Sequence, residues 1–300
     1  MNTLSRRAFL STASAVSIGA VALQMDARLS AADAASGLRG RIHHSVCKWC
    51  YPKIALNDLC VAGKEMGITS IDLVAPGDFA TLKKHDLVCA MTTSATIKGP
   101  KGEDIGSIGL GFNRTEHHDL LVQANEPYIA AVADAGFKHL ICFSGNRKGM
   151  DEETGLKNCA EGLKRLMPLA EKWGVVLVME LLNSRVNHAD YMCDKSDWGI
   201  ELCKRVGSAN FKLLYDIYHM QIMEGDVIAR IRAGKEYFAH YHTGGVPGRH
   251  EIDETQELNY PAIMRAIAET GYKGHVAQEF IPAKPDVLGS LRQAVGICDV

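Results

Sequence analysis

Residues 175–180, Val-Val-Leu-Val-Met-Glu, form an unbroken apolar run that ends on a carboxylate. Such a run of β-branched and aliphatic residues is typical of a strand buried on both faces of a parallel sheet. Three later apolar runs end in the same way, at Asp216, His242 and Glu279. The steps from Glu180 onward are 36, 26 and 37 residues, close to the length of one strand-helix-strand repeat. Equivalent points on four successive parallel strands would therefore bring these side chains together.

Short apolar runs alternate with longer amphipathic runs along most of the chain. The expected strands are 42–47, 70–74, 87–92, 140–143, 175–180, 211–216, 237–242 and 275–279. The expected helices are 55–66, 79–84, 119–135, 154–173, 195–206, 227–233 and 260–270. Because strands and helices alternate, the pattern predicts a parallel sheet covered by helices.

Glycines mark the ends of the expected helices, where the residue after a helix often takes a positive φ. Six of them stand shortly before the next strand: Gly67, Gly136, Gly174, Gly207, Gly234 and Gly271. Eight strands and about 250 residues make a complete barrel of alternating strands and helices. The sequence therefore predicts an α/β protein with a single (β/α)8 TIM barrel over residues 35–300.

The N-terminal segment has the features of an export signal. Residues 5–10, Ser-Arg-Arg-Ala-Phe-Leu, precede a weakly apolar stretch of small residues that runs to Leu23, and they resemble the twin-arginine signal of folded exported proteins. An ordinary Sec signal or an uncleaved anchor is the alternative, but the spacing of the Arg pair and Phe-Leu favours the first reading. Cleavage sites of the small-x-small type occur at 32–34 and 30–32. We expect a signal over residues 1–34, the twin-arginine translocase as a partner, and a periplasmic location.

Composition excludes several classes of protein. Residues 1–34 contain three Arg and two Asp, so the remaining 266 residues carry 30 basic and 33 acidic side chains, a net charge of −3. This balance offers no general attraction for nucleic acid, and no later segment is apolar enough to anchor the chain in a membrane. The nine cysteines cannot all pair within one chain, so we expect buried, unpaired thiols. The oligomeric state stays open, a homo-oligomer included.

One connection, residues 93–118, is too long for a routine turn and contains five glycines. In a barrel it would emerge on the face where ligands bind, which favours a lid or a substrate-contact loop. A disordered insertion explains the same composition equally well.

The four strand-end residues have the chemistry of a metal site. In a barrel of this type the C-terminal ends of the strands face the catalytic mouth. A strand-terminal carboxylate taken alone is often only solvated or a helix cap, but four potential ligands at one structural phase favour a shared metal. Three carboxylates and one imidazole suit Mn²⁺ or Mg²⁺, and Co²⁺, Fe²⁺ or Zn²⁺ are also compatible.

Several motifs in the second half of the chain strengthen this interpretation. They are Met179-Glu-Leu-Leu-Asn-Ser-Arg185, Tyr215-Asp-Ile-Tyr-His-Met-Gln221, His240-Tyr-His242, Val246-Pro-Gly-Arg-His-Glu251, Asn259-Tyr-Pro261 and Gln278-Glu-Phe280. With them the chain resembles the xylose isomerase-like barrel superfamily of sugar isomerases and epimerases, most closely its hydroxypyruvate isomerase-like branch.

The resemblance implies roles for individual residues. Glu180, Asp216, His242 and Glu279 would bind a divalent metal, and Glu180 and Glu279 would also act as the acid/base pair. His219, three residues after Asp216, and Arg249 would bind substrate. The hydroxypyruvate isomerase pattern has Gln where His242 stands, whereas the related ketose 3-epimerases have His there.

The chemistry of the residues supports proton transfer independently of that resemblance. Moving a proton between the carbons beside a carbonyl needs a base, an acid and a positive charge for the enediolate oxygens. Two glutamates on opposite sides of a metal supply all three. Arg249 has a guanidinium suited to a carboxylate, unless it pairs with Glu251 or Asp253. Arg185 is a second candidate for binding an anion.

Two further side chains are expected near the mouth. His240 should point to the same side as His242 but deeper in the barrel, as a buried histidine behind the site rather than a ligand. Trp49 would give an apolar wall or pack in the core.

The sequence therefore predicts a metal-dependent isomerase that converts hydroxypyruvate to tartronate semialdehyde, or acts on a related short substrate, through an enediolate. A ketose 3-epimerase or another sugar epimerase is the nearest alternative. A non-catalytic sugar-binding barrel is a weaker alternative. An abasic-site endonuclease is weaker too, because it would need several metals and a basic DNA groove.

Overall fold

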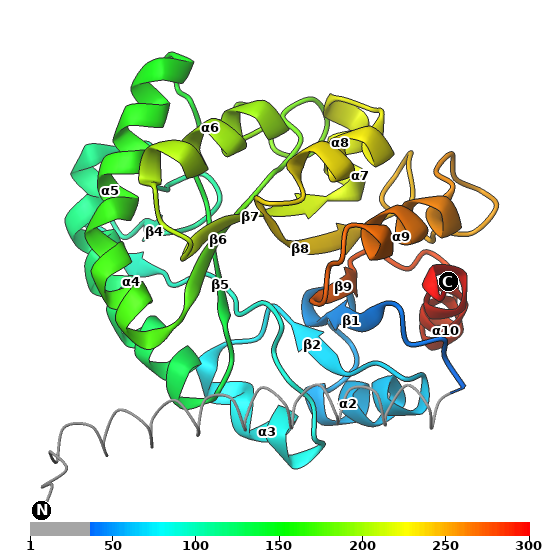
Figure 1. Ribbon diagram of the computed structural model, residues 1–300. Helices are drawn as coiled ribbons and strands as arrows, with labels where there is room; N and C mark the ends of the chain where they lie inside the picture. Colours follow the sequence, from blue (N-terminus) through cyan, green and yellow to red (C-terminus); the bar gives the residue numbers. More distant parts are fainter. Residues whose placement is uncertain (1–36) are drawn as a thin grey trace, which may run out of the picture.

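A computed structural model describes residues 37–300, so the expected signal over residues 1–34 lies outside the described residues. Within this range seven strands form one curled sheet in the order β2-β1-β9-β8-β7-β6-β5 (Figure 1). All neighbouring strands in it are parallel. The strands are β1 His43–Cys47, β2 Ser70–Asp72, β5 His139–Cys142, β6 Val176–Glu180, β7 Phe211–Asp216, β8 Phe238–Thr243 and β9 His275–Gln278. The predicted TIM-barrel fold is confirmed.

The expected strand at 87–92 closes the barrel without forming a regular ladder. Parallel bridges join Ser70 to Val88 on the β2 side and Thr92 to Leu140 on the β5 side. Between them, the backbone N–H of Ala90 donates to Ser70 Oγ at 2.8 Å, and His139 Nδ1 donates to the Ala90 carbonyl at 2.9 Å. The prediction of eight regular strands is wrong at this position because side chains bind the backbone groups that a ladder would use.

Helices surround the sheet on its outer side (Figure 1). They are α2 Leu56–Glu65, α3 Phe79–Lys84, α4 His118–Asp134, α5 Glu152–Trp173, α6 Ser196–Val206, α7 Ile217–Met223, α8 Val227–Gly234, α9 Tyr260–Glu269 and α10 Val287–Cys298, with short 3₁₀ turns η1 Lys48–Cys50, η2 Pro76–Asp78 and η3 Thr115–His117. The sequence predicted seven of the nine α-helices of the described residues, with ends within two residues, but not α7 or α10. No helix among residues 37–300 is long and apolar enough to cross a membrane.

Five of the six helix-end glycines have the positive φ expected of them: Gly67, Gly136, Gly174, Gly207 and Gly271. Gly234 differs, because it is the last residue of α8. A Cβ on Gly234 would lie 2.3 Å from the ring of Phe238. There glycine allows helix α8 to approach strand β8 closely.

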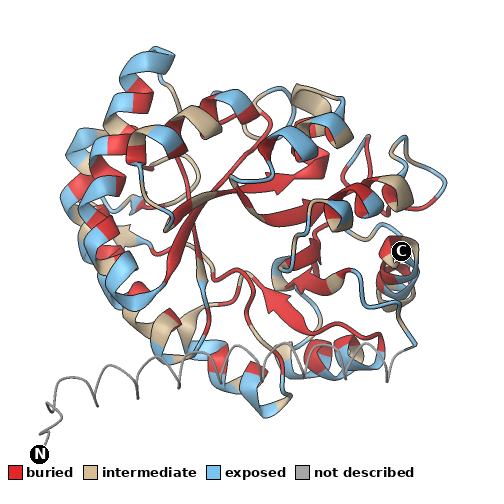
Figure 2. Ribbon diagram, viewed as in Figure 1, coloured by how far each residue is buried: buried red, intermediate tan, exposed pale blue. Residues whose placement is uncertain are grey.

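The core lies between the sheet and the inward faces of the helices, while the outer helix faces are exposed (Figure 2). Every residue of β6 is buried, as expected for a strand covered on both sides. All nine cysteines are buried and free of disulfides. The expectation of buried, unpaired thiols is therefore confirmed.

The long connection at 93–118 is folded. It contains a small antiparallel pair, β3 Ile97–Lys98 and β4 Asp104–Ile105, and then packs on the segment after β5. A Cβ on Gly111 would lie 2.1 Å from the Phe143 carbonyl oxygen, and Asn113 N donates to Ser144 O at 2.8 Å. The alternative of a disordered insertion is wrong, because the segment is held by its own hairpin and by this close approach.

Candidate metal centre

The structure brings the four predicted metal ligands together at the C-terminal ends of neighbouring strands. Glu180 ends β6, Asp216 ends β7, His242 is the penultimate residue of β8, and Glu279 follows β9. One potential ligand atom from each residue lies within 4.8 Å of the other three, and all four side chains are buried. We call these four residues the metal cluster.

His242 lies between the two glutamates of the cluster. Its Nδ1 is 2.9 Å from Glu279 Oε2 and 3.4 Å from Glu180 Oε1. Arg249 Nη2 donates to Glu279 Oε2 at 2.6 Å and lies 3.5 Å from Asp216 Oδ2. Three carboxylates with one guanidinium and one imidazole therefore leave an excess of acceptor oxygens in a buried space.

Two oxygens of the metal cluster lack hydrogen-bond partners among the described residues. They are Glu180 Oε1 and Asp216 Oδ2, and both are buried. An unsatisfied buried acceptor is costly, and a bound cation removes that cost. Because the donors are oxygen-rich with a single nitrogen, the set fits a hard or borderline divalent ion.

The two glutamates have pKa values displaced in opposite directions. Burial, and then the charge of Glu279, raise the pKa of Glu180. Burial would also raise the pKa of Glu279, but His242 and Arg249 outweigh it and hold that pKa well below its usual value. Two carboxyl groups whose environments separate their pKa values are suited to acting as an acid and a base.

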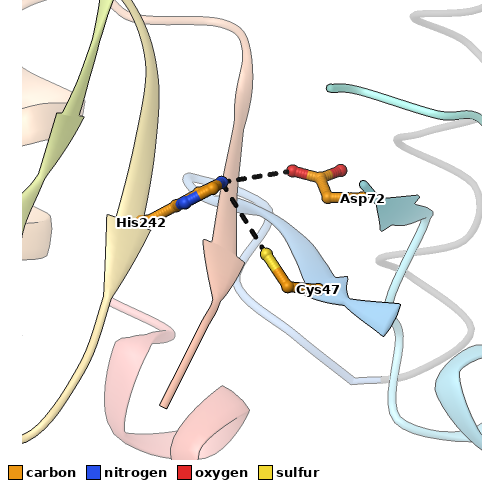
Figure 3. A group of neighbouring side chains, drawn as sticks. All are labelled: Cys47, Asp72 and His242. Atoms are coloured by element: carbon orange, nitrogen blue, oxygen red, sulfur yellow. Dashed lines mark hydrogen bonds and ion pairs between the residues drawn. The ribbon is translucent and has the colours of Figure 1, made fainter. Parts of the chain in front are cut away.

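The second ring nitrogen of His242 points toward Cys47 and Asp72 (Figure 3). Its Nε2 lies 3.7 Å from Cys47 Sγ and 3.8 Å from Asp72 Oδ2, with all three side chains buried. Cys47 ends β1 and Asp72 ends β2. Sequence reasoning missed both residues, although the strand-end position that singled out the four ligands applies to them as well.

Both carboxylate oxygens of Asp72 accept hydrogen bonds. Its Oδ1 accepts from Ser45 Oγ at 2.6 Å and from Ser70 Oγ at 2.9 Å. Its Oδ2 accepts from His240 Nε2 at 2.6 Å. His240 is thus a buried histidine behind the metal cluster, at the position that the alternation along β8 predicted.

Arg249 is held between two aromatic rings. The centre of its guanidinium lies 5.2 Å from the Trp49 ring and 5.4 Å from the Tyr218 ring. Trp49 also donates from Nε1 to Glu279 Oε1 at 2.8 Å, a contact that the expected apolar wall did not include. The rings of Trp49 and Tyr218 fix the position of Arg249, and the hydrogen bond from Trp49 fixes that of Glu279.

The alternative pairing of Arg249 with Glu251 or Asp253 is wrong, because both carboxylates have other partners. Glu251 accepts from Ala283 N and Ser290 Oγ, and Asp253 pairs with Lys284.

His219 presents a free donor to the metal cluster. Its Nδ1 accepts from the backbone N–H of Asn183 at 3.1 Å and from Asn183 Nδ2 at 2.6 Å, so the proton of the neutral ring is on Nε2. Burial, and then Arg249, lower the pKa of His219 well below its usual value, which keeps the ring neutral. Nε2 is 3.7 Å from Asp216 Oδ2 and has no hydrogen-bond partner within residues 37–300.

The structure does not bring Arg185 to this site. Its side chain is exposed, and Nη1 donates to the carbonyl of Ile222 at 2.9 Å. A role for Arg185 in binding an anion stays a prediction.

Comparison with known proteins places the chain in a family. Residues 80–294 match the family model described as Xylose isomerase-like TIM barrel. The chain belongs to this family. In this chain the three carboxylates and the histidine that could hold a metal ion lie at the strand ends described above.

Relatives in the family are named as isomerases and epimerases. The chain is 38% identical over 109 residues to the 2-oxo-tetronate isomerase of Cupriavidus necator, over 36% of this chain and 41% of that protein. It is 31% identical over 129 residues to a Homo sapiens protein provisionally named a hydroxypyruvate isomerase, over 43% and 47%. It is 31% identical over 136 residues to the D-psicose 3-epimerase of Ruminiclostridium cellulolyticum, over 44% and 43%. Each match thus spans less than half of the relative's length.

Solved structures share the fold over nearly the whole chain. A family 2 AP endonuclease from Brucella melitensis superposes with a TM-score of 0.70 at 24% identity, over 83% of this chain and 96% of that one. At this identity the likeness concerns the barrel fold alone.

Proposed function

We propose that this protein is a divalent-metal-dependent isomerase of short hydroxy-keto acids. The reaction that we propose first is the conversion of hydroxypyruvate to tartronate semialdehyde. The observation that carries the proposal is the placement of Glu180 and Glu279 beside Nδ1 of His242, with His219 and Arg249 near Asp216 in the same cluster. The names of the isomerase relatives, which denote short keto acids, support this substrate class.

The metal would be held by Glu180, Asp216, His242 and Glu279. Mn²⁺ and Mg²⁺ are the first candidates for this metal. A bound divalent ion supplies positive charge to the oxygens of an α-hydroxy-carbonyl group and lowers the pKa of its hydroxyl. Co²⁺, Fe²⁺ and Zn²⁺ also suit this donor set.

The chain's own residues would handle the proton. Glu279, the carboxylate of lower pKa, takes the proton from C3 of hydroxypyruvate, which gives the enediolate. Glu180, whose pKa is raised, returns a proton to C2, and the proton of the C3 hydroxyl passes to the C2 oxygen, so that the carbonyl now lies at C3. His219 donates from Nε2 to a substrate oxygen.

Arg249 would position the acid group of the substrate. Its Nε is buried and has no hydrogen-bond partner among the described residues, so one donor of the guanidinium is free while Nη2 holds Glu279. A charged donor next to the cluster favours a substrate that carries a carboxylate.

Proton exchange into the substrate tests the proposal. The protein loaded with Mn²⁺ is incubated with hydroxypyruvate in D₂O, with the Glu279→Gln variant as the control for uncatalysed exchange. We expect tartronate semialdehyde that carries deuterium at C2. The absence of both product and exchange above the control would overturn the assignment.

A ketose 3-epimerase is the second candidate, favoured by the imidazole ligand His242 and by the epimerase relative. Incubation with a panel of ketoses separates the two functions. Epimerised ketose without turnover of hydroxypyruvate would establish this candidate in place of the first.

We also propose that the protein is exported to the periplasm as a folded chain. The support is the Ser5 to Leu10 motif and the weakly apolar stretch of small residues that follows it to Leu23. Replacing Arg6 and Arg7 together by Lys should retain the protein in the cytoplasm, as measured by cell fractionation. Export of that variant at the normal level would refute the twin-arginine route.

A further inference from the structure

A cavity of about 450 Å³ lies at the end of the barrel opposite the metal cluster. Its lining includes Thr69, which precedes β2, His139 at the start of β5, and His275 at the start of β9. Because the strands are parallel, their starts share one face of the barrel and their ends, with the metal cluster, share the other. The cavity is therefore separate from the candidate metal centre.

Small residues leave this space open. Cys89 and Ala90 line it from the stretch that joins β2 to β5 only by isolated bridges, and Gly136 lines it from the turn before β5. A Cβ on Gly136 would meet no atom within 4 Å. Val88 and Phe137 supply apolar wall. A volume of this size with mostly apolar walls and a few polar groups is typical of sites for small organic molecules.

The histidines of the cavity are neutral hydrogen-bonding groups. His139 Nδ1 donates to the Ala90 carbonyl at 2.9 Å, which leaves its Nε2 as an acceptor. Burial, followed by His240, lowers the pKa of His139 to about 4. Burial lowers the pKa of His275 to about 3, and its Nε2 lies 3.0 Å from Thr69 Oγ1. A bound molecule would thus meet an uncharged acceptor at His139.

Two lysines and one carboxylate, Asp86, line the same cavity. Lys83 and Lys138 are lining residues, and Lys83 Nζ lies 5.8 Å from the ring centre of Phe137. Neither lysine forms an ion pair with an acidic side chain within residues 37–300, whereas the lining residue Asp86 is paired with Lys64 at 3.4 Å. Two ammonium groups without an ion-pair partner, beside an apolar wall, attract an anion that has an apolar body.

We propose that this cavity binds a small amphipathic monocarboxylate. Its apolar body would lie against Phe137 and Val88, its carboxylate would pair with Lys83 and Lys138, and a hydroxyl would donate to His139. A molecule with one aromatic ring has the size and the two polar ends that this arrangement requires. The site is distinct from the proposed catalytic function and does not depend on it.

Calorimetric titration of the full chain with 4-hydroxyphenylacetate tests the proposal. We expect saturable binding of one molecule per chain, with a dissociation constant on the order of 1 mM or tighter. The neutral analogue 2-(4-hydroxyphenyl)ethanol, in which a hydroxymethyl group replaces the carboxylate, should bind at least about tenfold more weakly, because a charge-assisted contact contributes about that factor.

A matched pair of double variants locates the binding. Lys83→Gln with Lys138→Gln should weaken binding of 4-hydroxyphenylacetate at least about tenfold. Lys84→Gln with Lys157→Gln removes the same charge from two exposed lysines outside the cavity lining and should leave the affinity unchanged. All four positions tolerate polar side chains, so both proteins should fold. Absence of binding, or equal affinity in the two double variants, would overturn the proposal.

Discussion

Glu180 and Glu279 share one ring nitrogen: His242 Nδ1 lies 3.4 Å from the first carboxylate and 2.9 Å from the second. The pKa of Glu180 is raised by burial and by Glu279, whereas the pKa of Glu279 is held low by His242 and Arg249 against the effect of burial. These two glutamates lie three strand positions apart in the barrel wall. Their pKa values suit one to accept a proton and the other to donate one.

Replacing either glutamate by glutamine should abolish turnover while leaving the fold intact. Glu180→Gln and Glu279→Gln each remove a proton-transfer group, and such groups contribute about 10²- to 10⁴-fold to rate. Steady-state kcat for hydroxypyruvate, with circular dichroism as the check on folding, gives the measurement. Glu161→Gln, an exposed position on α5, is the control and should retain full activity. Normal turnover in either cluster variant contradicts the assigned roles.

Removal of metal should inactivate the protein and make it less stable. Glu180 Oε1 and Asp216 Oδ2 are buried and unbonded within the described residues, so a cation gains strong contacts only in the folded state. Dialysis against a chelator should remove activity, and Mn²⁺ should restore it. Metal at a hundredfold excess over its dissociation constant should add about 2.7 kcal/mol to the free energy of unfolding. Asp216→Asn should weaken this stabilisation, and an unchanged melting temperature with and without metal would count against the site.

Periodicity was enough to predict the barrel and the meeting of the four candidate metal ligands, because strand ends in a parallel barrel share one face. It failed where side chains replace backbone bonding, as at Ala90, whose N–H and C=O are bound by Ser70 and His139. The sequence did not predict helix α7, because this helix begins directly after Asp216 at the end of a strand. Asp216 Oδ1 caps the helix by accepting from His219 N at 3.0 Å. Contacts such as Trp49 with Glu279 depend on tertiary packing between distant segments, which spacing along the chain does not encode.

Asp72 should prove to be a positioning residue for the metal cluster. It binds His240, Ser45 and Ser70 and lies beside Nε2 of His242. Asp72→Asn removes the buried charge that these donors surround, which should lower the free energy of unfolding by about 3 kcal/mol. The variant should also bind Mn²⁺ about 10- to 100-fold more weakly, as for other residues that orient a metal ligand.

Two measurements separate positioning from a general loss of stability. Urea unfolding gives the stability of the Asp72→Asn variant, and Mn²⁺ titration is done at a temperature where the variant is fully folded. Asp134→Asn, at an exposed position on α4, should change neither quantity. A variant that is destabilised but binds Mn²⁺ with normal affinity would show that Asp72 only supports the fold.

Acid should destabilise the protein in a pH range set by its buried histidines, and His44 offers the clearest test. Its ring is fully buried, and neither nitrogen has a hydrogen-bond partner among residues 37–300. Burial, and then His43, lower the pKa of His44 from 6.5 to about 4. Between these two values the unfolded chain binds a proton that the folded chain does not, so stability falls as the pH drops from about 6.5 to about 4.

Replacing His44 by Leu should remove this part of the pH dependence. The shift in pKa corresponds to a loss of about 2 kcal/mol on going from about pH 7.5 to about pH 5 in the parent protein. Urea unfolding at the two pH values measures the difference, which should be smaller by that amount in His44→Leu. His85→Gln, at a half-exposed histidine, should keep the parental difference. An equal loss of stability in the parent and in His44→Leu would mean that the acid sensitivity comes from other groups.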